Sequence, residues 1–187
     1  MKKIILIPLV SFSMAIAAHA LLITPSTMPQ FTGNDNSNLN AAQITAIVGG
    51  GLLTEVYKQN VGEAFDTGLF ALSYQTTFSN ALLDPQDADI DYVGGPTIPG
   101  QVFLYVKDGN QEPAFYIFDI TSWNRVEGLD LRGFWPNQGA ISHVTLLNRP
   151  GTVPPGTVPD GGGTLALLGL AVGAFEVIRR KLGTAGK

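Results

Sequence analysis

The sequence predicts a mainly β protein, an antiparallel and jelly-roll-like β-sandwich with one short N-terminal helix. Strand-like segments recur about every twelve residues through the middle of the chain, separated by turns rich in Gly, Pro and Asn. The length of 187 residues fits one such domain with short appendages at both ends. The chain has no cysteine, which excludes a disulfide scaffold, a thiolate metal site and a cysteine nucleophile.

The first expected element of the domain is the helix. Asn38 is a suitable cap for a helix over Leu39–Val48, because Ser, Thr, Asp and Asn are the preferred capping residues. Ile44 and Val48 belong to an apolar stripe at helical spacing, and the run Gly49–Gly51 ends the helix.

Strands follow the helix. The first places Phe70, Leu72 and Tyr74 on one face by period-two alternation. A later pair of apolar runs flanks the turn sequence Asp108–Asn110, which is typical of a β-hairpin. The strands expected by this reasoning are 70–78, 90–92, 102–107, 114–121, 129–132 and 140–147.

The charges are few and unevenly spread. Charged residues make up 14% of the chain, against roughly 25% in an average soluble protein. Residues 21–159 contain thirteen acidic and five basic residues, a net charge of −8, while basic residues gather at both ends. An acidic middle repels nucleic acid and anionic lipid headgroups. Its expected partners are cations, neutral glycans or proteins with a positive face, and nucleic acid is excluded.

The N-terminal residues 1–20 have the features of a secretory signal peptide. Lys2 and Lys3 precede an apolar stretch, and Ala18 and Ala20 form a small-x-small cleavage site. The alternative is a short buried helix, which the basic start and the Ala-x-Ala ending disfavour.

The C-terminal residues have the order of a membrane anchor. A Pro- and Gly-rich linker precedes an apolar run that ends at Arg179, Arg180 and Lys181, a basic cluster expected to stop transfer and stay cytoplasmic. The apolar run from Leu165 reaches only about 21 Å at about 1.5 Å per residue, so a ~30 Å span needs some preceding residues as well. An ordinary type I anchor with a flexible stalk is the alternative interpretation.

The motif in front of this helix supports a more specific interpretation. Val158, Pro159, Asp160 and Gly161, followed by the apolar helix and the basic cluster, resemble the PEP-CTERM protein-sorting signal in its VPDSG variant. The resemblance implies processing by an exosortase, a membrane cysteine protease, and transfer to the envelope or exopolysaccharide matrix of a Gram-negative bacterium. The segments FYIFDITSWN, GFWPNQGAISHVTLL and VKDGNQEPAFYIFDI resemble bodies carried by PEP-CTERM proteins of unassigned biochemical function.

The expected organisation follows from these signals. We expect an exported protein, held in the inner membrane by its C-terminal helix before processing and then placed in the envelope or extracellular matrix. The predicted parts are a signal peptide (1–20), a flexible lead (21–38), a β-sandwich domain (39–148), a linker with the sorting motif (149–163), a transmembrane helix (164–178) and a basic cytoplasmic tail (179–187).

The most suggestive polar cluster is a row of aspartates. Asp87, Asp89 and Asp91 are two residues apart, so a strand would place them on one face, where they could bind calcium. The cluster lacks the EF-hand pattern, and the favoured alternative is three solvated acids with the intervening residues inward. His143 is expected near the sandwich surface and has no partner at metal-ligand spacing.

The aromatic residues suggest a second kind of site. Trp123 and Trp135 lie in predicted turns beside asparagines and are the candidate glycan contacts, although large aromatics in a sandwich are more often core. The main prediction is a non-enzymatic structural or adhesive protein without cofactor or metal. A carbohydrate-binding module for exopolysaccharide is the alternative, and a secreted hydrolase with paired carboxylates is the third hypothesis.

Overall fold

The computed structural model describes residues 20–27, 29–79, 84–108, 110–136 and 139–151, which all belong to a unit that ends at Thr152. We call this part of the chain the body. The predicted signal peptide up to residue 19, the sorting motif, the transmembrane helix and the basic tail lie outside the described residues. Within the described ranges, no helix combines the length and the apolar character needed to cross a membrane.

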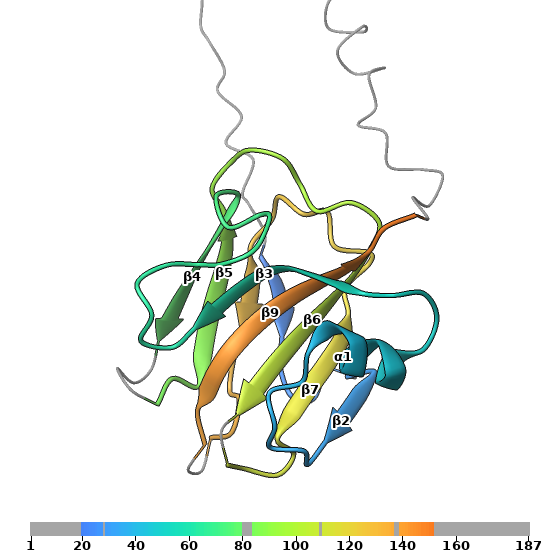
Figure 1. The fold of residues 1–187 in the computed structure, drawn as a ribbon. Helices are drawn as coiled ribbons and strands as arrows, with labels where there is room; N and C mark the ends of the chain where they lie inside the picture. The colour runs from blue at the N-terminus through green and yellow to red at the C-terminus, as the bar shows by residue number, and fades with distance from the viewer. Residues whose placement is uncertain (1–19, 28, 80–83, 109, 137–138, 152–187) are drawn as a thin grey trace, which may run out of the picture. The chain divides into compact units, whose positions relative to one another are not determined.

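The described body contains two β-sheets and a short helix, α1 (Ala41–Val48) (Figure 1). The four-stranded sheet has the order β1 (Leu21–Ile23), β8 (Leu129–Leu131), β5 (Asp87–Tyr92), β4 (Tyr74–Ser79). The five-stranded sheet has the order β2 (Phe31–Gly33), β7 (Phe115–Asp119), β6 (Gln101–Asp108), β9 (Ile141–Arg149), β3 (Thr54–Asn60).

The main hydrophobic core lies between the two sheets. Ala88 and Ile90 of β5 contribute to the same buried cluster as Leu104 of β6 and Leu146 of β9, and all four are fully buried. Burial of alternate side chains from two facing sheets supplies most of the driving force for such a fold. The prediction of a mainly β protein with a short helix is thereby confirmed.

The predicted sheets were wholly antiparallel, and this is wrong at one edge. β1 pairs with β8 in parallel, with Leu21 opposite Leu129 and Ile23 opposite Leu131. The reason is that the chain crosses almost the whole body between these two strands, and a long connection permits parallel pairing.

A second, smaller core lies on the outer face of the five-stranded sheet. Ile44 of α1 packs with Phe103 and Tyr105 of β6 and with Leu147 of β9. The strand β6 is therefore buried on both faces, which explains its nearly continuous apolar sequence.

The helix begins two residues later than predicted. Asn40, not Asn38, is the cap: its Oδ1 accepts from Gln43 N at 3.0 Å, and its own N–H donates to Gln43 Oε1 at 2.9 Å. In this reciprocal capping box, the backbone N–H group of each residue donates to a side-chain oxygen of the other, which fixes the start of the helix. The helix ends at Gly49, whose φ of 77° suits glycine.

The structure contradicts two further predictions. The lead 21–38 was expected to lack regular structure, yet it supplies β1 and β2, which extend one edge of each sheet. The strand expected over 70–78 begins only at Tyr74, and Leu72 is 94% exposed instead of sharing its face. In both cases hydrogen bonds to a distant partner decide the structure, and alternation along the chain does not reveal them.

The start and the end of the body are tied to one region of the fold. Leu21 N donates to Gly128 O at 2.8 Å. In the loop just before Gly128, Arg125 Nη2 donates to Gly100 O at 2.9 Å. Gly100 packs so closely against Arg149 O, at the end of β9, that an added Cβ would clash with it. A short series of contacts thus links the first and last strands at the same end of the body.

Candidate functional site

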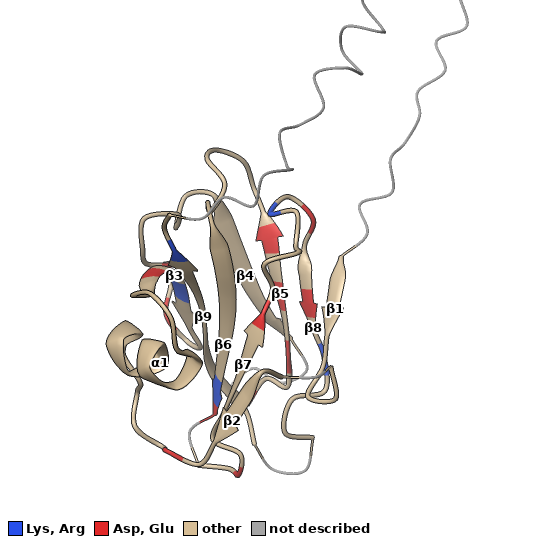
Figure 2. Ribbon diagram, turned by 90° about the vertical axis from the view of Figure 1, so that its right-hand side faces the viewer, with Lys and Arg blue, Asp and Glu red and all other residues tan. Residues whose placement is uncertain are grey.

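The aspartate row lies on β5, on the face turned away from the main core. Asp87, Asp89 and Asp91 alternate with Ala88 and Ile90, which are both 0% exposed. The acids therefore point outward, as the favoured alternative in the sequence required. Figure 2 shows acidic residues on β5 and on the neighbouring strand β8.

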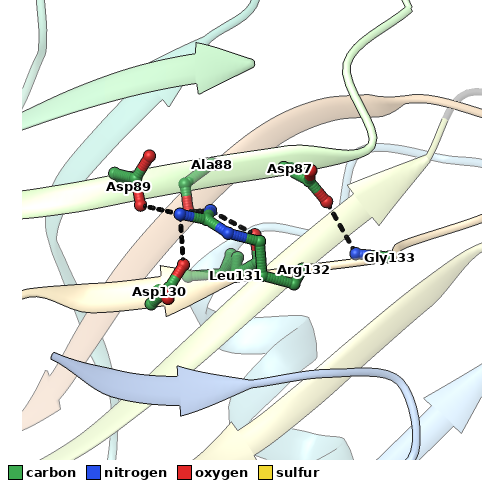
Figure 3. Close-up of polar contacts among 7 residues, drawn as sticks. All are labelled: Asp87, Ala88, Asp89, Asp130, Leu131, Arg132 and Gly133. Carbon is green, nitrogen blue, oxygen red and sulfur yellow. Dashed lines mark hydrogen bonds and ion pairs between the residues drawn. The ribbon is translucent and has the colours of Figure 1, made fainter. Parts of the chain in front are cut away.

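An arginine of the same chain occupies the space between these acids (Figure 3). Arg132 Nη2 lies 2.5 Å from Asp89 Oδ1 and 2.5 Å from Asp130 Oδ1. Its Nη1 donates to Leu131 O at 2.9 Å. Asp87 Oδ1 accepts from Gly133 N at 2.7 Å. Two of the candidate calcium ligands are thus engaged by protein donors.

The electrostatics of this cluster fit an internal ion-pair network. Burial alone lowers the pKa of Arg132, but its hydrogen bond to Asp89 and the charges of Asp89, Asp130 and Asp87 outweigh burial and raise it. The guanidinium therefore stays charged and offsets neighbouring carboxylates. In the part of the chain that the structure describes, no three His, Asp or Glu side chains are grouped as a metal site.

The two tryptophans, which were candidates for exposure in predicted turns, are both buried, as large aromatics in a sandwich more often are. Trp123 is 1% exposed, packs against Tyr74 with ring centroids 5.7 Å apart, and donates from Nε1 to Glu127 O at 2.8 Å. Trp135 is 6% exposed and donates from Nε1 to Pro113 O at 2.7 Å. A turn position fixes the backbone but not the side-chain direction, and here both indoles turn inward to cover the core.

A pocket of about 610 Å³ nevertheless involves Trp135. It lies where the loop after β1, the connection from β6 to β7 and the segment after β8 meet. Trp135 and Tyr116 form an aromatic part of its lining, with ring centroids 5.2 Å apart. Thr24, Ser26 and Glu112 add hydroxyl and carboxylate groups.

The backbone at this pocket is strained at its tryptophan. Trp135 has a φ of 50°, a left-handed conformation that is unfavourable for a bulky residue. Strain of this kind persists only where the surroundings impose it, and it is concentrated at binding sites. Burial also raises the pKa of Tyr116, so its phenol remains neutral and able to donate a hydrogen bond. An aromatic surface beside hydroxyl groups and a carboxylate is suited to binding a sugar ring.

The structure also contains a second cluster of polar side chains, which the sequence did not predict. Lys107, His143 and Tyr105 are each at most 3% exposed on the outer face of the five-stranded sheet. Burial lowers the pKa of Lys107, although the charges of Asp108 and Asp35 oppose the change. Burial, followed by the charges of Lys58 and Lys107, lowers the pKa of His143 to about 3. His143 is therefore a neutral buried residue, not the surface residue that was expected.

The comparisons with known proteins concern the C-terminal segment. Residues 157–182 match the VPDSG-CTERM motif, a PEP-CTERM-like sorting signal. The match includes both the motif at Val158–Gly161 and the basic cluster at Arg179–Lys181. No curated protein and no solved structure matches the chain. The segment lies outside the described residues, so its assignment rests on sequence.

Proposed function

We propose that this chain is an exported bacterial protein whose C-terminal signal is processed by an exosortase-type membrane enzyme. The match of residues 157–182 to the VPDSG-CTERM motif carries the proposal. A basic cluster after an apolar helix stays on the cytoplasmic side, so the body would be held outside the inner membrane until the motif is cut. Processing would then release the body to the envelope or extracellular matrix.

The arrangement of the body supports two membrane-directed segments. Leu21 and Arg149 belong to strands linked at the same end of the fold, through Gly128 and Gly100. An N-terminal signal and a C-terminal anchor can therefore both enter one membrane without unfolding the body. The linker from residue 149 to 163 contains four prolines, a composition typical of spacers between a domain and a processing signal.

A duplicated tripeptide in the linker offers a matched experiment. Thr-Val-Pro occurs at residues 152–154 and again at 157–159, but Asp160 follows only the second copy. We expect Val158→Ala/Pro159→Ala to leave the tail uncut in an exosortase-containing host, while Val153→Ala/Pro154→Ala is processed normally. Mass spectrometry of the C-terminus is the measurement. An intact tail in the wild-type protein when the enzyme is present contradicts the proposal, and so does equal cleavage of both variants.

For the body we propose a structural or adhesive role without catalysis. The net charge of −8 over residues 21–159 disfavours anionic surfaces and leaves neutral polymers and positively charged proteins as partners. An exopolysaccharide of low charge meets this requirement.

The pocket at Trp135 favours a second candidate, namely carbohydrate binding. Its described lining holds a single carboxylate, Glu112, whereas hydrolysis of a glycosidic bond by the usual mechanism uses two. The pocket therefore supports binding more than hydrolysis. This candidate keeps Trp135 as a glycan contact and replaces Trp123, which does not line the pocket, with Tyr116.

Binding can be measured by titrating the protein with neutral oligosaccharides and recording tryptophan fluorescence. We expect Glu112→Gln and Tyr116→Phe to weaken binding several-fold, since the first replaces one acceptor oxygen of the carboxylate with a donor and the second removes the hydroxyl, and a hydrogen bond is worth about 1 kcal/mol. Trp123→Phe is the matched control and should retain affinity, because that indole lies outside the pocket. Equal affinity of wild type and Glu112→Gln/Tyr116→Phe would remove the pocket from the binding model.

A further inference from the structure

The residue that follows the expected signal cleavage point is also the first residue of a strand. Cleavage after Ala20 makes Leu21 the first residue of the mature chain, and Leu21 opens β1. Ile23, at the other end of β1, is 2% exposed in the main core. The new chain end is therefore held in a packed strand with no spacer between the cleavage point and the fold.

The backbone nitrogen of Leu21 has Gly128 O as its acceptor, and a carboxylate lies close to the same glycine. The Leu21 N–H donates to Gly128 O at 2.8 Å. A Cβ built on Gly128 would lie 3.0 Å from Asp91 Oδ1 and 3.6 Å from Ala20 Cβ. The Asp91 carboxylate and the residue removed by cleavage thus flank the same glycine. Because Gly128 has no side chain, nothing from that residue separates them.

The charged groups around this position are mostly acidic. Asp91 approaches from β5, Glu127 precedes Gly128, and Asp130 on β8 is the register partner of Leu22. The two nearby arginines are already engaged: Arg132 pairs with Asp89 and Asp130, and Arg125 donates to the carbonyls of Thr121, Trp123 and Gly100. A positive charge on Leu21 N would therefore meet an excess of negative charge.

We propose that Gly128 O and the Asp91 carboxylate form a binding site for the α-ammonium group that leader removal creates on Leu21. Hydrolysis of the Ala20–Leu21 peptide bond places the hydroxyl of water on the Ala20 carbonyl carbon and a proton on Leu21 N. The resulting amine takes up a second proton from solvent. One N–H continues to donate to Gly128 O, and the added donors bind Asp91. Processing thereby fastens β1 to β8 and β5.

This inference rests on the proposed export and on cleavage after Ala20. The capture of the ammonium has a consequence for the fold, because an ion pair with a hydrogen bond strengthens the edge where β1 joins the four-stranded sheet. The mature chain should be more stable than the same chain with a blocked N-terminus. Signal removal would then act as a maturation step as well as a release step.

The test compares free and acetylated N-termini on the mature chain, residues 21–187, purified in detergent. The chain is made to begin at Leu21 by cleaving a fusion partner, and its α-amine is acetylated near pH 6.5, where lysines stay protonated. We expect acetylation to lower the melting temperature of the wild type by about 1–3 °C. Asp91→Asn should abolish this difference. Asp84→Asn, which removes an exposed acid before the opposite end of β5, should leave it unchanged.

A second readout is the titration of the α-amine by NMR. Pairing with Asp91 should raise its pKa above the usual value of about 7.7, and Asp91→Asn should return it toward that value. An equal acetylation effect in the wild type and in Asp91→Asn overturns the ammonium site, as does an unraised pKa. Cleavage is tested separately: an N-terminus other than Leu21 on the exported protein contradicts the export proposal and not the chemistry of the site.

Discussion

Arg132, the residue after β8, is joined to Asp89 of the neighbouring strand β5, with Nη2 and Oδ1 2.5 Å apart. The same nitrogen lies 2.5 Å from Asp130 Oδ1, and Asp89 and Asp130 are register partners. Without the guanidinium, two carboxylates would face each other on adjacent strands, which destabilises a sheet. Arg132 therefore converts a repulsive pair into an attractive group of three.

Removal of this charge should destabilise the body. We expect Arg132→Gln to lower the free energy of unfolding by about 1 kcal/mol, a modest value because the side chains of Arg132 and Asp89 are both more than a third exposed. The loss should shrink at high salt, since screening weakens the repulsion that remains. Urea unfolding at low and high ionic strength measures it, and Arg132→Lys is the charge-retaining control. Identical midpoints for wild type and Arg132→Gln would contradict this role.

The same geometry predicts the response to calcium. Since Arg132 lies between Asp89 and Asp130 and Gly133 N binds Asp87, the row presents no vacant set of carboxylates. Millimolar calcium should leave the melting temperature of the wild-type protein unchanged relative to EDTA. A rise in the melting temperature, which binding to the native state produces, would show that the acids are a calcium site after all.

Much of the fold could be predicted from the sequence because most strands carry their own pattern. The strand β6 was expected at 102–107 and spans Gln101–Asp108, and β9 was expected at 140–147 and spans Ile141–Arg149. Both strands contribute side chains to the main core on one face and to the smaller core on the other, so apolar residues recur along both sequences. The strands β1 and β2 have three residues each, too few for a period to be recognised, and their pairing with β8 and β7 depends on residues far along the chain.

The candidate sites could be predicted less well. The outward direction of Asp87, Asp89 and Asp91 follows from alternation, but the arginine that pairs with Asp89 comes from more than forty residues away. The burial of Trp123 also depends on contacts that no local pattern encodes, here with Tyr74. The sorting signal is the opposite case, because motif, apolar run and basic cluster are contiguous and were recognised from the sequence.

The buried histidine predicts a loss of stability in acid. His143 has a pKa of about 3 in the folded protein, lowered mainly by burial, against about 6.5 when unfolded. Between pH 6.5 and 3 the unfolded chain binds a proton that the folded chain does not, so stability falls as the pH falls. The slope contributed by this residue approaches 1.4 kcal/mol per pH unit.

His143→Gln isolates this contribution. The variant keeps a polar side chain of similar size but cannot titrate, so its stability should decline less steeply than that of the wild type below pH 6.5. Above that pH the two proteins should show parallel profiles. Urea unfolding in steps from pH 7 to pH 4 provides the comparison. Parallel profiles across the entire range would mean that His143 is protonated in the folded protein and that its burial has little effect.

Two glycines in the connection between β3 and β4 both have a positive φ, but only one of them lies close to neighbouring atoms. Substituting each in turn separates the cost of the backbone conformation from the cost of a steric clash. Gly68 has a φ of 105°, and a Cβ there would lie 2.5 Å from Val56 O. Gly62 has a φ of 81°, with no atom within 4 Å of the added Cβ. Both glycines adopt a conformation unfavourable for alanine, but only Gly68 is also pressed against the backbone of β3.

Alanine at the two positions should therefore have unequal consequences. We expect Gly62→Ala to lower the free energy of unfolding by about 1 kcal/mol, the cost of a left-handed residue with a side chain. Gly68→Ala should cost about 3 kcal/mol or more, because Val56 O must move while it accepts the hydrogen bond from Phe70 N. Urea midpoints of the two variants measure the difference. Equal losses would mean that the connection shifts freely against β3, which would remove the close approach as the reason for glycine at position 68.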